Sequence, residues 1–141
     1  MDYNSILHKA ESFVKDLYNN SNQDRLVFNN LEHTMNVVAR ASEIASNYQL
    51  YDKDQLVLYT AAWFHDTGHL YVEPAMHEVK SVDLMKNFFL NLGMEDFELI
   101  GPIECCILAT RMPQQPSNLA DQIICDADTY HLGTAAFKKT N

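Results

Sequence analysis

The stretch 60–68 constrains the fold more than any other, because an apolar run leads directly into an adjacent histidine and aspartate. Trp63 and Phe64 precede His65 and Asp66. Burying an imidazole and a carboxylate behind two aromatic rings costs free energy unless a partner satisfies both groups. Imidazole nitrogen and carboxylate oxygen together suit a divalent ion such as Mn, Fe, Co, Ni, Zn or Mg. A buried His–Asp hydrogen bond would also satisfy them, so the pair alone leaves both interpretations open.

Six stretches of the chain place apolar residues at the spacing of an amphipathic helix. They begin near Ile6, Asn29, Asp52, Glu73, Phe97 and Ser117. Asn29 and Asp52, each followed three residues later by Glu or Gln, resemble capping boxes, and Ser117 is the expected N-cap of the last helix. No segment shows the alternation of a strand. The sequence therefore predicts an all-α fold, a compact bundle of about five to seven helices.

Glycine and proline divide these helices. The third stretch is apolar on more than one face, which predicts a central helix that ends at Gly68 in the left-handed conformation. His65 and Asp66 would then lie in its last turn. Pro102, directly after Gly101, predicts that the fifth helix is kinked or divided in two.

The length of 141 residues fits a single helical domain spanning 1–141, with one hydrophobic core. The last helix has barely begun when the chain stops at Asn141. Either the fold closes there or the chain is a shortened form of a longer protein.

The charge balance limits the class of partner. Nineteen acidic residues against ten basic ones give a formal net charge of −9, which disfavours nucleic acid. A small phosphorylated substrate remains compatible if a metal ion supplies local positive charge.

The sequence predicts a cytoplasmic protein without a membrane partner. Its three cysteines form no disulfide or CxxC pattern, and it has no apolar signal core and no run of membrane-spanning length. Oligomeric state leaves no readable pattern.

Four segments in order carry a family resemblance. They are 32–37 around His33, 61–68 around His65-Asp66, 77–81 beginning His77-Glu78, and 125–128, which reads Cys-Asp-Ala-Asp. Over residues 30–133 the chain resembles the HD-domain superfamily of metal-dependent phosphohydrolases. The resemblance implies a helical bundle with a divalent ion at its centre, held by His33, His65, Asp66 and Asp128. Asp126 is the alternative to Asp128, which is preferred because the aspartate of the family commonly follows alanine.

The resemblance also implies the chemistry. A phosphohydrolase of this kind acts on a small phosphate ester, here a nucleotide or related metabolite, with Asp66 as both ligand and proton acceptor. His77 would contact a substrate phosphate or a bound water, with Glu78 orienting it. Lys80 and Arg111 are the cations best placed in sequence to meet phosphate, although each is also an ordinary exposed cation.

Two features keep other interpretations open. Two-metal branches of the family add histidines after the HD pair, and His77 stands where the first is expected. The segment 106–111 offers no histidine where the next would fall, and His69 is expected to face solvent beyond the helix end. A Glu-Asp pair typical of alarmone hydrolases is absent after Asp66, which disfavours that substrate. The alternatives to an enzyme are a catalytically silent, metal- and nucleotide-binding regulatory module, and a structural metal staple or hydrogen-bonded network.

Overall fold

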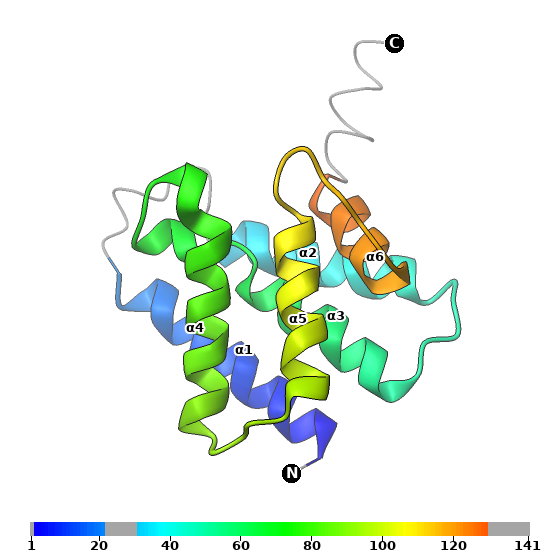
Figure 1. Cartoon of the computed structure of the whole chain (residues 1–141), viewed down its shortest axis with the longest axis horizontal. Helices are drawn as coiled ribbons and strands as arrows, with labels where there is room; N and C mark the ends of the chain where they lie inside the picture. Colours follow the sequence, from blue (N-terminus) through cyan, green and yellow to red (C-terminus); the bar gives the residue numbers. More distant parts are fainter. Residues whose placement is uncertain (1, 22–30, 130–141) are drawn as a thin grey trace.

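The computed structural model describes residues 2–21 and 31–129, and these form a bundle of six α-helices (Figure 1). The helices are α1 (Tyr3–Asn19), α2 (Leu31–Ala45), α3 (Asp52–Phe64), α4 (His77–Asn91), α5 (Phe97–Ala109) and α6 (Leu119–Asp128). Two short 3₁₀ turns, η2 (Thr67–Leu70) and η3 (Pro74–Met76), connect α3 to α4. The described residues contain no strand, and the predicted all-α fold is confirmed. Asn29 lies outside the described residues, as does the chain after residue 129.

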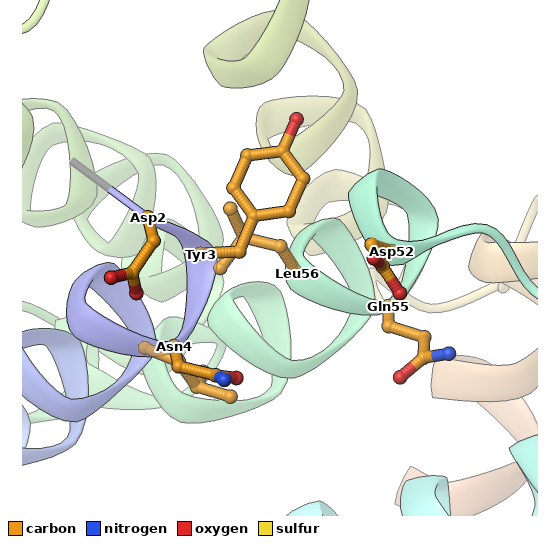
Figure 2. A pocket seen from close by; sticks show the side chains of 7 residues that line it. Asp2, Tyr3, Asn4, Asp52, Gln55 and Leu56 are labelled. Atoms are coloured by element: carbon orange, nitrogen blue, oxygen red, sulfur yellow. The ribbon is translucent and has the colours of Figure 1, made fainter.

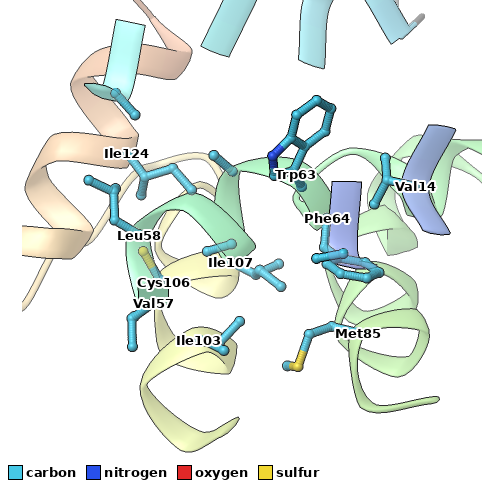
Figure 3. Packing of buried hydrophobic residues seen from close by; sticks show 14 of the residues in the cluster. Val14, Val57, Leu58, Trp63, Phe64, Met85, Ile103, Cys106, Ile107 and Ile124 are labelled. Carbon is cyan, nitrogen blue, oxygen red and sulfur yellow. The ribbon is translucent and has the colours of Figure 1, made fainter. Parts of the chain in front are cut away.

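Helix α3 is the centre of the bundle, as its unusually apolar sequence predicts. It contacts α1, α2, α5 and α6. Figure 3 shows Leu58 and Phe64 of this helix among side chains from the surrounding helices, including Val14 of α1, Ile107 of α5 and Ile124 of α6. Fully burying a side chain of this size contributes roughly 1.5–3 kcal/mol. This packing fixes the direction of α3 and so the position of the residues that follow it.

Side-chain caps at the helix starts differ from the sequence prediction by one residue. At α6 the N-cap is Asn118, whose side chain accepts from the Asp121 backbone N–H, while Ser117 donates to the Asp121 carboxylate. At α3 the N-cap is Tyr51 without a side-chain bond, so Asp52 is the first helical residue and its predicted capping box is wrong. Here an acidic first turn faces the positive end of the helix dipole instead.

Pro102 lies inside α5 without dividing it, because α5 runs as one helix from Phe97 to Ala109. The missing proline N–H removes the bond to the carbonyl of Glu98. Glu98 is exposed in the first turn, so water can reach that carbonyl.

A pocket of about 480 Å³ lies between the first turns of α1 and α3 (Figure 2). Its lining comprises Asp2, Tyr3, Asn4, Leu7, Asp52, Gln55 and Leu56. None of the residues to which the sequence assigns chemistry lines this pocket.

Among the described residues, no helix combines the length and the apolar character that a membrane span requires.

Candidate metal centre

The polar end of α3 is built differently from the sequence prediction. The helix ends at Phe64, and His65 and Asp66 form the junction to the 3₁₀ turn η2. Gly68 lies inside that turn, and among the described glycines only Gly93 has a positive φ. The left-handed helix end predicted at Gly68 is therefore wrong. The position needs glycine for another reason, since a Cβ there would collide with the backbone carbonyl oxygen of His77.

A buried hydroxyl ties this junction to α4. The Oγ of Ser81 donates to the carbonyl of His65 at 3.0 Å and accepts from the backbone N–H of Gly68 at 2.8 Å. Ser81 is fully buried. We call this pair of bonds the Ser81 clamp. Together with the close approach of Gly68 and His77, it holds the start of α4 against the junction formed by His65 and Asp66.

Four side chains from three parts of the chain converge beside the junction, and we call them the first group. His33 comes from the first turn of α2, His65 and Asp66 follow α3, and Asp128 ends α6. The Nε2 atom of His33 is 3.2 Å from Asp66 Oδ2 and 3.3 Å from Asp128 Oδ1. The Nε2 atom of His65 is 3.3 Å and 3.2 Å from the same two oxygens. One donor atom from each residue lies within 4.8 Å of the others.

The orientation of His65 suits metal binding. Its Nδ1 atom donates to the carbonyl of Ala62 at 2.7 Å, so Nε2 is directed at the two carboxylates. A ligating histidine usually donates its other ring N–H to such an oxygen, which fixes both the tautomer and the ring. Two imidazole nitrogens and two carboxylate oxygens form a donor set that fits a divalent first-row ion or Mg.

The charges of the first group reinforce one another. Hydrogen bonds to Asp128 and Asp66 raise the pKa of His33 to about 9. Burial opposes the charged form of His65, but the charges of Asp66 and Asp128 raise its pKa well above the usual value. Burial likewise disfavours ionised Asp128, while the charge of His65 and the hydrogen bond from His33 lower its pKa to about 2. Burial also disfavours ionised Asp66, but the charge of His65 lowers its pKa well below the usual value. Both carboxylates are therefore ionised and can bind a cation, and the protonated imidazoles must release protons when it binds.

A second group of potential ligands shares Asp66 with the first. The Oδ1 atom of Asp66 is 3.3 Å from His77 Nε2 and 3.7 Å from His69 Nε2. The two imidazole rings stack with centroids 3.7 Å apart. The side chain of His69 is only 12% exposed, so the expectation that it faces solvent is wrong. Burial, and then the charge of His77, lower the pKa of His69 to about 4.

His77 and Glu78 open α4 beside this second group. The Nδ1 atom of His77 donates to the carbonyl of Pro74 at 2.7 Å, and its Nε2 atom is 3.3 Å from Glu78 Oε2. Burial opposes protonation of His77, but hydrogen bonds to Asp66 and Pro74 raise its pKa. The side chain of Glu78 is 9% exposed, so its carboxylate adds negative charge at the edge of the site.

The remaining predicted residues lie outside both groups. Asp126 is exposed on α6, whereas Asp128 belongs to the first group. Lys80 lies with its Nζ 5.6 Å from the ring centroid of Tyr71, and Arg111 is exposed after the end of α5. Thr110, in the segment where two-metal branches carry a histidine, is buried and donates to the carbonyl of Ile107.

Comparison with known proteins agrees with this arrangement. The model of the HD domain family matches residues 30–133, which include every residue of the two groups. The comparison with curated proteins and the comparison with solved structures each gave no match. Because the family match covers most of the chain, this protein belongs to the HD domain family.

Proposed function

We propose that this protein is a metal-dependent phosphohydrolase that hydrolyses a small phosphate ester, a nucleotide or a related metabolite. The convergence of His33, His65, Asp66 and Asp128 on one point carries the proposal. Membership of the HD domain family, a superfamily of metal-dependent phosphohydrolases, supports it independently.

The first group has room for a substrate. Four protein ligands around an ion that prefers five or six leave positions open, which is typical of catalytic rather than structural sites. The exposed fractions differ across the group: 26% for the side chain of His33 and 21% for Asp128, but 0% for His65. The more exposed side of the first group is therefore the side where α2 begins and α6 ends.

The chain's own residues have distinct roles in this proposal. When bound, a divalent ion supplies Lewis-acid polarisation of a phosphoryl oxygen and lowers the pKa of a bound water. Asp66 would help to hold that ion, and its carboxylate could accept the proton of the attacking water. His77, fixed by its bond to Pro74, is directed toward the same carboxylate and donates a hydrogen bond to phosphate, with Glu78 beside its Nε2. Lys80 and Arg111 are weaker candidates for phosphate contact.

The proposed substrate is a free small molecule in the cytoplasm rather than nucleic acid or a membrane lipid. The net charge of −9 repels polyphosphate chains, so a phosphate must be attracted locally. All three cysteines are free, which suits a reducing compartment.

Metal content and activity measured on the same preparations test the proposal. We expect the purified protein to retain a transition metal and to release phosphate from one or more members of a nucleotide and phosphoester panel supplied with Mn, Mg, Co or Ni. His65→Ala should lose the metal and reduce activity by at least about two orders of magnitude, because removing a ligand exceeds the 10–100-fold effect of removing an outer partner. His8→Ala, an exposed histidine on α1, is the matched control. Equal activity of a chelated, metal-free preparation would refute the mechanism.

A regulatory module that binds metal and nucleotide without turnover is the second candidate. Thr110 favours it, since this buried side chain is committed to Ile107 and offers no ligand where two-metal branches have one. The same panel separates the two functions. Thermal stabilisation by a nucleotide without phosphate release would identify the module.

A further inference from the structure

A pocket of about 400 Å³ lies between the last turns of α1 and the end of η2. Its lining includes Asp16, Leu17 and Asn20 of α1, and Leu70 and Tyr71 on the opposite wall. Its volume is in the range of about 300–1,000 Å³ that is common for small-molecule sites. We propose that this pocket binds the base of a nucleotide substrate and selects guanine. The inference rests on the proposed function, because it names the part of the substrate that the metal centre does not hold.

One wall of the pocket continues directly from the metal centre. The turn η2 begins at the residue after Asp66, and Leu70 at its end lines the pocket. Tyr71 follows, and its backbone N–H donates to the carbonyl of Gly68 at 3.0 Å. This short segment therefore follows a potential metal ligand at its start and leads into the ring of Tyr71 at its end.

The other wall is joined to the start of α2. Tyr18, in the last turns of α1, is buried, and its hydroxyl is 3.2 Å from Thr34 Oγ1. Thr34 directly follows His33 in α2. Burial raises the pKa of Tyr18, and the negative charge of Asp66 adds to the rise. The part of α1 that lines the pocket therefore lies close to the metal centre.

Tyr71 offers its ring to a planar ligand. It is 46% exposed, although Leu70 before it is buried. The Nζ atom of Lys80 lies over the ring, 5.6 Å from its centroid, in a cation–π contact. A cation over one face leaves the other face for a base, and stacking on an aromatic side chain suits every base. Lys80 is one turn beyond His77 on α4, so its ammonium can meet ribose or phosphate oxygens of the same nucleotide.

Two polar side chains one turn apart on α1 define the preferred base. A carboxylate such as Asp16 only accepts hydrogen bonds, whereas the amide of Asn20 both donates and accepts. Guanine presents its ring N1–H and its amino group as adjacent donors, with the O6 acceptor beside them. Adenine presents a ring nitrogen acceptor beside its amino group, and that lone pair would face the carboxylate. The pair of side chains therefore favours guanine over adenine.

Binding to the chelator-treated full chain tests the pocket without turnover. The probes are guanosine monophosphate, adenosine monophosphate and ribose 5-phosphate, which has no base, and NMR titration measures their affinities. Guanosine monophosphate should bind roughly 10-fold more tightly than adenosine monophosphate, the scale of a hydrogen bond to a charged group. Ribose 5-phosphate should bind most weakly, because it lacks the stacking ring.

Substitutions in the two walls separate stacking from base selection. Tyr71→Ala should weaken binding of guanosine monophosphate by roughly 10–100-fold, and Tyr71→Phe should retain it because the ring remains. Tyr48→Ala removes a tyrosine of similar exposure, 50%, and is the control. Asp16→Asn should remove the preference for guanine and leave the affinity for ribose 5-phosphate unchanged. Circular dichroism should show the same helical signal in all variants.

Kinetics of the metal-loaded protein separate this inference from the proposed hydrolysis. Tyr71→Ala should raise KM for the guanine nucleotide with little change in kcat, since the ring contacts the base and not the reacting phosphate. Equal treatment of the three probes by the wild type, or unchanged binding by Tyr71→Ala, would refute the base pocket without affecting the hydrolase. Binding that depends on Tyr71 without phosphate release from any ester would support the pocket and refute the proposed hydrolysis.

Discussion

The two sides of Asp66 are built in contrasting ways. On the Oδ2 side, the potential ligands come from α2, the junction after α3 and the end of α6, which only the folded bundle brings together. On the Oδ1 side, His69 and His77 lie within eleven residues of Asp66, in a turn and the helix start that follows it. The first side thus depends on the whole core. The second depends on local packing at Gly68 and Ser81.

Asp66→Asn should have the largest effect, because it removes the carboxylate that both sides share. We expect loss of the ion of the first group and a fall in activity of roughly 10³-fold, the scale of losing a directly acting electrostatic group. Metal stoichiometry and phosphate release measure it, with Asp83→Asn on the exposed face of α4 as the control. If the variant bound the ion as well as the wild type does, Asp66 would not be a ligand.

Asp128→Asn should break only the Oδ2 side. The affinity of the first group for its ion should fall by roughly 100-fold or more, since Asp128 contacts both His33 and His65. Asp126→Asn, two residues away and exposed, should change nothing. Competition with a chromogenic chelator measures the metal affinity of each variant. If Asp126→Asn weakened metal binding and Asp128→Asn did not, Asp126 would be the ligand.

Ser81→Ala should lower metal affinity by a smaller amount than loss of a carboxylate does. The Ser81 clamp holds the junction on which both sides of Asp66 depend, and it does not contact an ion. Removing the hydroxyl leaves the Gly68 N–H without its acceptor, at a cost of about 1–3 kcal/mol in unfolding free energy. Metal affinity should fall by roughly 10–100-fold. Thr110→Val removes another buried hydroxyl that bonds a backbone carbonyl and controls for stability alone. Equal metal affinity in the two variants would restrict Ser81 to a structural role.

The smallest expected effect is a pH dependence of stability in the metal-free protein. The pKa of His33 is raised to about 9 from 6.5. Its contribution to the free energy of unfolding is therefore fully present below pH 6.5 and is lost as the pH rises toward 9. Because His33 is partly exposed, the loss should be on the order of 1 kcal/mol. Urea denaturation in chelator at pH 6 and pH 9 measures it. His33→Gln should reduce the difference, with the remainder coming from His65 and His77, whose pKa values are also raised, whereas His8→Ala should preserve it.

Bound metal should reverse that trend. Ions compete with protons for the histidines, so metal-bound protein gains stability as the pH rises over the same range. Comparing the two curves for one preparation separates the proton network from the ion.

Features that depend on local pattern were predictable from the sequence. The spacing of apolar residues located α1, because burial on an amphipathic helix repeats with the turn, and apolar residues on more than one face identified α3 as the central helix. Convergence of His33 with Asp128 was not derivable in this way, since no local rule relates residues so far apart. Only the family resemblance brought them together.

His69 was missed because the helix was expected to end at Gly68. The chain instead continues as a 3₁₀ turn, held by the tertiary contact of Gly68 with His77. One signal was available: Asp66 and His69 are three residues apart, the spacing that puts side chains on one face of a helical turn. Treating Gly68 as part of a turn would have placed both side chains together.

The contact between Gly68 and the His77 carbonyl also has a consequence for mutational tolerance. A ligand histidine can be exchanged for a chemically similar residue and leave a partial site. At position 68 even the single methyl group of alanine must displace the backbone of α4, and with it His77 and Glu78. A scan of all substitutions should therefore find Gly68, which has no side chain, as intolerant of change as the four residues of the first group.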